Sequence, residues 1–315
     1  MLIYLISLFM ITILMTAILL YPEISVAGAV SGLLVWFNSV LPSLFPFMVL
    51  TGLLIRLDIM KRLPSFISRK YAGQCNPATF LFTALIGLLC GYPMGLKTVA
   101  ELKASKQLTK RQASLLISFA NQPGPMFILG YALPVCDPDR KYSNRFLLAF
   151  YGSVILTALF FAVWQQMSAK RVQEVTDNVS TTVEVISANR PSFFSVFEDT
   201  ILSSMITLTK IGGYMMFFSL ITAILKASFP TRPDIILVFG GLMEMTSGIS
   251  ETGLLPEFIK PYFVLGFISF GGLCVTAQSF SLGQLETKEQ WRYLAAKSLQ
   301  TLIVLVLFYL MTDIL

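Results

Sequence analysis

The sequence predicts an all-α polytopic membrane protein, and three observations support this fold class. The chain has 315 residues, of which 55% are hydrophobic and only 13% are charged, whereas about one-quarter of a soluble domain is charged. Apolar runs of spanning length recur along the whole chain, with a mean hydropathy of +0.74. The runs are continuously apolar rather than alternating, so membrane helices are expected rather than a barrel.

The clear spans divide the chain into two halves. We expect residues 1–167 to form the first half, with spans at 2–21 and 146–167, and residues 199–315 to form the second, with spans at 199–225 and 293–312. The polar stretch 168–198 is interpreted as the linker between them. The first run lacks a preceding Lys or Arg, so we expect a retained span rather than a signal peptide. Residues 26–57 form another apolar stretch, which Pro42 and Pro46 should bend.

Two regions, 78–134 and 235–282, contain the same types of segment in the same order. Each has an apolar approach, a glycine-containing polar turn, an amphipathic return, a short apolar segment and a second polar break. Interrupted hydrophobic segments at matching places of two halves are typical of transporters built from inverted repeats. The sequence therefore predicts inverted repeats with two re-entrant helical hairpins, at 78–106 and 235–259, and with broken helices after them.

The charge distribution gives the same topology for the first hairpin. Both 56–70 and 97–111 are rich in Lys and Arg, so the positive-inside rule places both in the cytoplasm. A run with both flanks on one side cannot cross, so it must reverse at "GYPMG", residues 91–95. The second half is then inverted relative to the first.

Candidate binding residues lie at the hairpin tips and at the helix breaks, which we expect at Asn121–Gln122 and Thr276–Gln278. Non-helical backbone at membrane depth is tolerated only inside protein or beside a wet cavity, and ionisable groups there are usually functional. Lys97 has an alternative interpretation as a surface charge, and Glu244 as a structural partner of Lys97 or Lys210. The predicted substrate-binding residues are Gly91, Tyr92, Pro93, Gly95, Lys97, Asn121, Gln122, Glu244, Thr246, Ser247, Thr276 and Gln278.

Other site classes are not expected. The chain has no histidine, and its four cysteines show no C-x-x-C spacing, so no metal site, cofactor or catalytic centre is predicted, and the protein is not expected to be an enzyme. Basic loops at a membrane surface account for the net charge of +6, so no nucleic acid partner is expected. The expected partners are membrane lipids and a small-molecule solute, with a homo-oligomer as a further option.

The motifs "LPSLFPFMVLTGLL", "GYPMGLKTVAELKASKQLTKRQASLLISFANQPGPMFILGYAL" and "FGGLCVTAQSFS" resemble the sporulation integral membrane protein YlbJ family of spore-forming Firmicutes. The likeness covers about residues 30–285. This family is part of the wider nucleoside recognition (Gate) domain group and is similar in plan to concentrative nucleoside transporters. The resemblance implies hairpin tips and broken helices that hold a nucleoside-like solute with a cation alongside, and a role in formation of the spore cortex or envelope.

We therefore expect a multi-pass protein of the bacterial inner membrane that moves a small polar solute by alternating access, with Na⁺ or H⁺ as candidate coupling ions. The alternative is a non-transporting structural component of a sporulation assembly, for which the hairpins are inherited architecture only.

Overall fold

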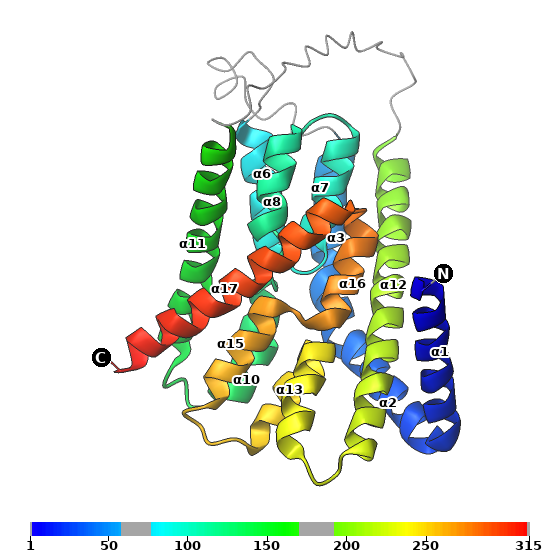
Figure 1. Cartoon of the computed structure of the whole chain (residues 1–315). Coiled ribbons are helices and arrows are strands. Elements are labelled where there is room, and N and C mark those ends of the chain that lie inside the picture. Colours follow the sequence, from blue (N-terminus) through cyan, green and yellow to red (C-terminus); the bar gives the residue numbers. More distant parts are fainter. Residues whose placement is uncertain (1, 58–76, 170–191, 314–315) are drawn as a thin grey trace.

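The computed structural model describes residues 2–57, 77–169 and 192–313 (Figure 1). Within these ranges all regular secondary structure is helical. Five of the helical stretches are long and apolar enough to cross a membrane: Pro22–Arg56, Ser143–Ser168, Phe193–Ser228, Lys260–Gly283 and Thr287–Thr312. The predicted all-α polytopic fold is thus confirmed, and the chain is a multi-pass membrane protein.

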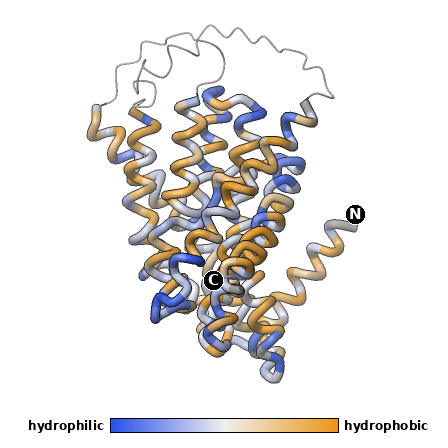
Figure 2. Tube along the Cα trace, turned by 90° about the vertical axis from the view of Figure 1, so that its left-hand side faces the viewer, coloured by the Kyte–Doolittle hydropathy of each residue, from blue (hydrophilic) through white to orange (hydrophobic). Residues whose placement is uncertain are grey.

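The first half starts with an apolar helix and a long bent one. They are α1 (Leu2–Leu20), then α2 (Pro22–Val35), the π-helical turn η1 (Trp36–Val40) and α3 (Leu41–Arg56). The π-helical turn explains the bend between α2 and α3, because its wider hydrogen-bonding pattern interrupts the α-helical ladder. Helix α1 stands apart from the rest of the molecule in Figure 2, and its large apolar side chains are exposed, as lipid contact requires.

A helical hairpin and a broken helix follow. The hairpin arms are α6 (Pro77–Leu89) and α7 (Met94–Ala104), and the broken helix comprises α8 (Lys110–Phe119), α9 (Pro125–Phe127), η2 (Ile128–Ala132) and α10 (Leu133–Cys136). The long helix α11 (Ser143–Ala169) ends the half. Thr109 starts α8 with a capping box, in which its hydroxyl accepts from the backbone N–H of Gln112 at 3.1 Å.

The second half repeats this order of elements. Its helices are α12 (Phe193–Ser228), α13 (Pro233–Met243), α14 (Met245–Glu251), η3 (Thr252–Leu254), α15 (Lys260–Phe270), α16 (Gly272–Gly283) and α17 (Thr287–Asp313). In Figure 1 the α6–α7 hairpin opens toward the upper end of the molecule, and the α13–α14 hairpin opens toward the lower end. The two hairpins thus enter the molecule from opposite ends.

Several boundaries differ from the sequence prediction. The segment 168–198 is partly helical, because α11 continues to Ala169 and α12 already begins at Phe193. Helix α17 begins at Thr287 rather than at residue 293, because the polar and charged residues 287–292 extend the helix before its apolar run. The remainder of the predicted linker, residues 170–191, and most of the basic loop 56–70 lie outside the described residues.

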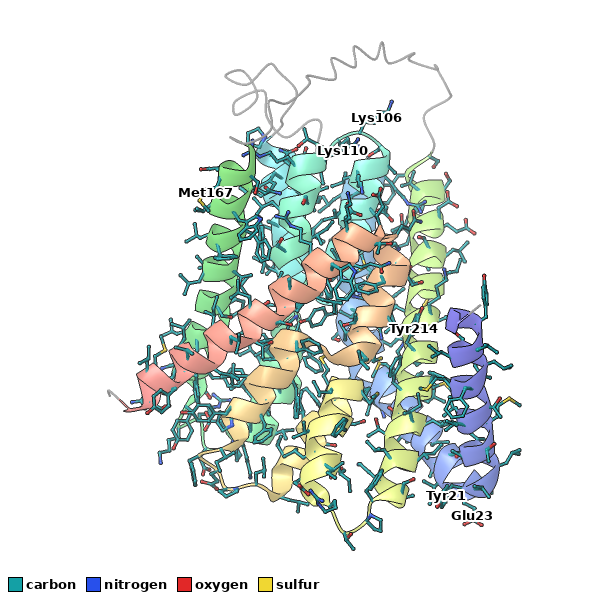
Figure 3. All side chains as sticks on the ribbon, viewed as in Figure 1. Tyr21, Glu23, Lys106, Lys110, Met167 and Tyr214 are labelled. Atoms are coloured by element: carbon teal, nitrogen blue, oxygen red, sulfur yellow. The ribbon has the colours of Figure 1, made fainter. Side chains whose placement is uncertain are left out.

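Both ends of the molecule carry charged residues. Figure 3 shows Lys106 and Lys110 at the upper end and Glu23 beside Tyr21 at the lower end. Between them, α12 packs along α2 and α3, and α11 packs along α17. The hairpins and broken helices lie inside this frame, so the non-helical backbone at their tips is shielded from lipid.

Candidate functional site

Both hairpin tips, the first helix break and helix α16 meet at one small central cavity. Its volume is about 50 Å³, which is enough for a few water molecules or a small ion. Segments from α3 and α12 close its sides. The cavity is lined by Val40, Ser43, Leu44, Gly91, Tyr92, Pro123, Gly124, Phe127, Ile211, Met215, Glu244, Met245, Thr246, Cys274, Val275 and Gln278.

The first hairpin is held together by two glycines that face each other across its arms. A Cβ atom on Gly95 would lie 1.6 Å from the carbonyl oxygen of Ala120, and one on Gly87 would lie 2.0 Å from it. The first helix break is therefore clasped between the arms at backbone contact. At the tip, Gly91 has a φ of +84°, a left-handed conformation that glycine adopts without steric cost.

The second hairpin has the same construction. A Cβ atom on Gly248 of α14 would lie 2.2 Å from the Cα of Gly241 in α13, and the ring of Phe267 covers the pair. Gly95 and Gly248 thus hold equivalent positions, each on the second arm of its hairpin. Because both hairpins depend on a glycine pair, the two halves share a packing device as well as an order of elements.

Tyr92 connects the first hairpin tip to the second half. Its hydroxyl donates a hydrogen bond to the carbonyl of Ile268 at 2.8 Å and accepts one from Lys297 Nζ at 3.0 Å. Its ring also lines the central cavity. Tyr92 therefore lies between the cavity and the polar interior of α17.

The first helix break places two buried amides against α16 and α17. Asn121 Nδ2 donates to Ser279 Oγ at 2.9 Å and to Tyr293 OH at 3.2 Å. Gln122 and Gln300 exchange two hydrogen bonds of 2.9 Å each. The Oδ1 atom of Asn121 is buried without a hydrogen-bond partner among the residues that the structure describes. Both predicted residues are therefore in a polar interior, but neither lines the central cavity.

Glu244 forms the tip of the second hairpin and is 2% exposed. Its carboxylate accepts from the backbone N–H groups of Thr246 at 3.1 Å and Ser247 at 2.7 Å, and from the Thr246 hydroxyl. It thus caps α14, where the free N–H groups and the helix dipole favour an anion. No ion pair joins Glu244 to Lys97 or Lys210 within the described residues.

The second break lies earlier than the sequence predicted. The helix is interrupted at Gly271 and Gly272, where φ is +85° and +72°, whereas Thr276 and Gln278 lie inside α16. Thr276 donates its hydroxyl to the carbonyl of Gly272 at 2.8 Å. The polar side chains are therefore not the breaking element, and of the two only Gln278 reaches the cavity.

Lys97 lies above the tip, in a second cavity at the upper end. It donates to Thr207 of α12 at 2.8 Å and is 4.0 Å from Glu101. This upper cavity has a volume of about 570 Å³ and is also lined by Arg56, Asp199 and Lys210. A lower cavity of about 520 Å³ lies between α2, α12 and α14 and is lined by Ser219, Lys226 and Ser247, among others. Helix α12 contributes to all three cavities.

The predicted residues are thus distributed over several places. Gly91, Tyr92, Glu244, Thr246 and Gln278 share the central cavity. The others lie around it: Lys97 in the upper cavity, Ser247 in the lower one, Asn121 and Gln122 in the buried amide cluster, and Pro93, Gly95 and Thr276 within the hairpin and helix packing.

Sequence reasoning missed the polar face of α17. Tyr293, Lys297 and Gln300 are almost fully buried and hold the amides of the first break. Their spacing of four and three residues places them on one helix face, and this pattern within an apolar run was the available signal. No group of three or more Cys, Asp or Glu side chains suited to a metal ion occurs in the part of the chain that the structure describes.

Comparison with known proteins identifies a relative. The chain is 25% identical over 282 residues to the sporulation integral membrane protein YlbJ of Bacillus subtilis (strain 168), and the match covers 79% of this chain and 69% of that protein. The predicted resemblance to the YlbJ family is confirmed. No family model matches the chain, and no solved structure matches it. The likeness to YlbJ agrees with the multi-pass architecture, since both are integral membrane proteins.

Proposed function

We propose that this protein is a transporter that moves a small polar solute by alternating access and acts in sporulation. The observation that carries the proposal is the meeting of two hairpin tips, from opposite ends of the molecule, at one cavity that is lined by Glu244 among other residues. Tips of this kind present helix ends and backbone groups that bind polar solutes. The sporulation role rests on the similarity to YlbJ.

The cavities along α12 support the same proposal. The upper and lower cavities lie on either side of the central one and border the same helix. The central cavity, at about 50 Å³, is too small for a metabolite in the described conformation, so binding of a solute requires the hairpin tips to move apart. A nucleoside-like solute, implied by the family resemblance, is one candidate among small polar metabolites.

The experiment is an uptake screen that works with an unidentified solute. Membrane vesicles that contain the protein are incubated with a metabolite extract of sporulating cells, washed and analysed by mass spectrometry. We expect at least one polar metabolite to accumulate in wild-type vesicles and not in Glu244→Gln vesicles. Leu159→Ala, which changes a lipid-facing side chain that is 56% exposed, is the matched control and should accumulate it normally. The absence of any metabolite that depends on Glu244 would refute the proposal.

The small volume of the central cavity also favours a second candidate, a non-transporting component of a sporulation assembly. This candidate predicts that Glu244→Gln still supports sporulation, whereas replacement of the connections 58–76 or 170–191 abolishes it. Complementation of a sporulation defect by these variants separates the two candidates.

A further inference from the structure

Lys297 lies in the middle of a membrane helix, and no acidic side chain among the described residues pairs with it. It is 2% exposed and is among the largest fully buried side chains of the described residues. A buried charge is costly unless it is paired, and intramembrane lysines usually pair with a carboxylate or face a cavity. No ion pair includes Lys297 in residues 2–57, 77–169 and 192–313.

The surroundings of Lys297 are built for an ammonium group. Its Nζ donates to the Tyr92 hydroxyl at 3.0 Å, to Gln122 Oε1 at 3.1 Å and to Gln300 Oε1 at 3.4 Å. The Tyr92 and Tyr293 ring centroids lie 4.8 and 5.9 Å from it. Three neutral oxygens match the three N–H donors of a protonated lysine, and the rings add cation–π attraction.

Among described residues, these two tyrosines are the titratable groups that face Lys297. The helices α8, α11 and α15 pack against α17, and none of their charged side chains forms a hydrogen bond or ion pair with it in the described part of the chain. Within the described residues, the charge of Lys297 is therefore balanced by dipoles and aromatic rings rather than by a carboxylate. Its protonation state is not fixed by a neighbouring carboxylate.

The network around Lys297 also tolerates the loss of its proton. Gln122 Oε1 accepts a second hydrogen bond from Gln300 Nε2, and Gln300 Oε1 accepts one from Gln122 Nε2, both at 2.9 Å. Both amide oxygens thus keep a donor if Lys297 donates less. Tyr92 differs from the two amides, because its hydroxyl hydrogen already forms a hydrogen bond with the Ile268 carbonyl at 2.8 Å.

We propose that Lys297 is a proton-binding switch that fastens the first hairpin tip to α17 when protonated and releases it when neutral. This inference rests on the proposed transport function and identifies the proton as the coupling ion. When the proton passes from Nζ to water, one N–H bond breaks and a neutral amine with two N–H donors and a lone pair remains. The amine no longer offers donors to all three oxygens, so the contact with Tyr92 is weakened.

Lysine suits this role because its amine can lose a proton on burial, whereas arginine keeps its proton in proteins. Lys297→Arg should therefore hold the tip in the fastened state, and Lys297→Gln should remove the dependence on pH. Lys288→Gln, at an exposed position of the same helix, is the matched control.

Cys90, two residues before Tyr92 and buried at 2% exposure, reports the position of the tip. In full-length protein with Cys75, Cys136 and Cys274 replaced by alanine, the rate of Cys90 modification by a small water-soluble thiol reagent is followed by mass spectrometry. Dividing the wild-type rate by the Lys297→Arg rate at each pH cancels the chemistry of the thiol itself. We expect this ratio to rise about tenfold or more between about pH 6 and about pH 9.

Parallel rates in wild type and Lys297→Arg across this range would overturn the proposal, as would loss of the pH dependence in Lys288→Gln. If Lys297→Arg does not fold, the ratio of wild type to Lys297→Gln serves instead, and it must fall as the pH is lowered. These measurements need no solute, so they decide on the switch even if the uptake screen fails. If a solute is found, its uptake should respond to an imposed proton gradient in wild type and not in Lys297→Gln.

Discussion

The hydroxyl of Tyr92 donates a hydrogen bond to the carbonyl of Ile268, 176 residues later in the chain, at 2.8 Å. This bond joins the tip of the first hairpin to the last turn of α15, beside the second helix break. The two halves are therefore connected where each of them is interrupted.

Tyr92→Phe should destabilise the protein by about 1–3 kcal/mol, because it leaves a buried carbonyl without its donor and removes one acceptor from Lys297. The free energy of unfolding can be measured by reversible denaturation in mixed detergent micelles. Tyr262→Phe is the control: its hydroxyl is hydrogen-bonded to the partly exposed Thr312, at 2.8 Å, so a smaller loss is expected. Equal losses in both variants would contradict the role assigned to Tyr92.

Gly95→Ala should cost about 3 kcal/mol or prevent folding, because the new methyl group would lie 1.6 Å from the Ala120 carbonyl oxygen. Gly213→Ala, at a site in α12 where no heavy atom lies within 4 Å of the new carbon, should be neutral or stabilise by up to about 1 kcal/mol. Thermal unfolding monitored by size-exclusion chromatography separates the two outcomes. A well-folded Gly95→Ala protein would show that the hairpin arms are not in backbone contact.

Glu244→Gln should destabilise the protein by about 1–2 kcal/mol, because an amide has one acceptor oxygen where the carboxylate caps α14 with two. The same unfolding assay measures this loss. Glu257→Gln changes an exposed carboxylate outside the helices and should have little effect. A loss of uptake without this loss of stability would assign Glu244 to the solute alone.

Lys226 of α12 forms an ion pair with Glu251 at the end of α14, and Lys226 also lines the lower cavity. Lys226→Ala should change stability by no more than about 1 kcal/mol, because both side chains are partly exposed. It should however raise the rate at which Ser219→Cys, in the lower cavity, reacts with an impermeant thiol reagent. The reversed pair Lys226→Glu with Glu251→Lys should restore the slow rate. An unchanged rate in Lys226→Ala would show that the ion pair does not limit access to the lower cavity.

The sequence predicted those features that depend on residues close to one another in the chain. Composition and apolar runs predicted the all-α membrane fold, and the glycines and prolines of "GYPMG" and "NQPGP" lie where the chain is interrupted, at residues 90–93 and 120–124. The second break was misplaced because Thr276 and Gln278 are polar, whereas the interruption depends on the backbone of Gly271 and Gly272.

Long-range pairing was not predictable in the same way. Lys297 and Gln300 are hidden within an apolar run, and their significance depends on Gln122 and Tyr92, about 175–205 positions earlier. Lys97 was instead misplaced by reasoning from local sequence. It follows the hairpin tip closely in the sequence, so it was expected at the central cavity, but the rise of α7 places it in the upper cavity. Helix α12 begins six residues before the predicted span, at Phe193.

The glycine pairs Gly87–Gly95 and Gly241–Gly248 bring the arms of each hairpin to backbone contact. Bending such a hairpin along its length would require its two arms to separate, so each hairpin is expected to move as a rigid unit. The backbone changes that accompany a hairpin's movement must then occur in the connection that follows it. These hinge segments are residues 105–109 for the first hairpin and 252–259 for the second. Fluorophores placed on these connections would report the displacement of each hairpin without disturbing the interior.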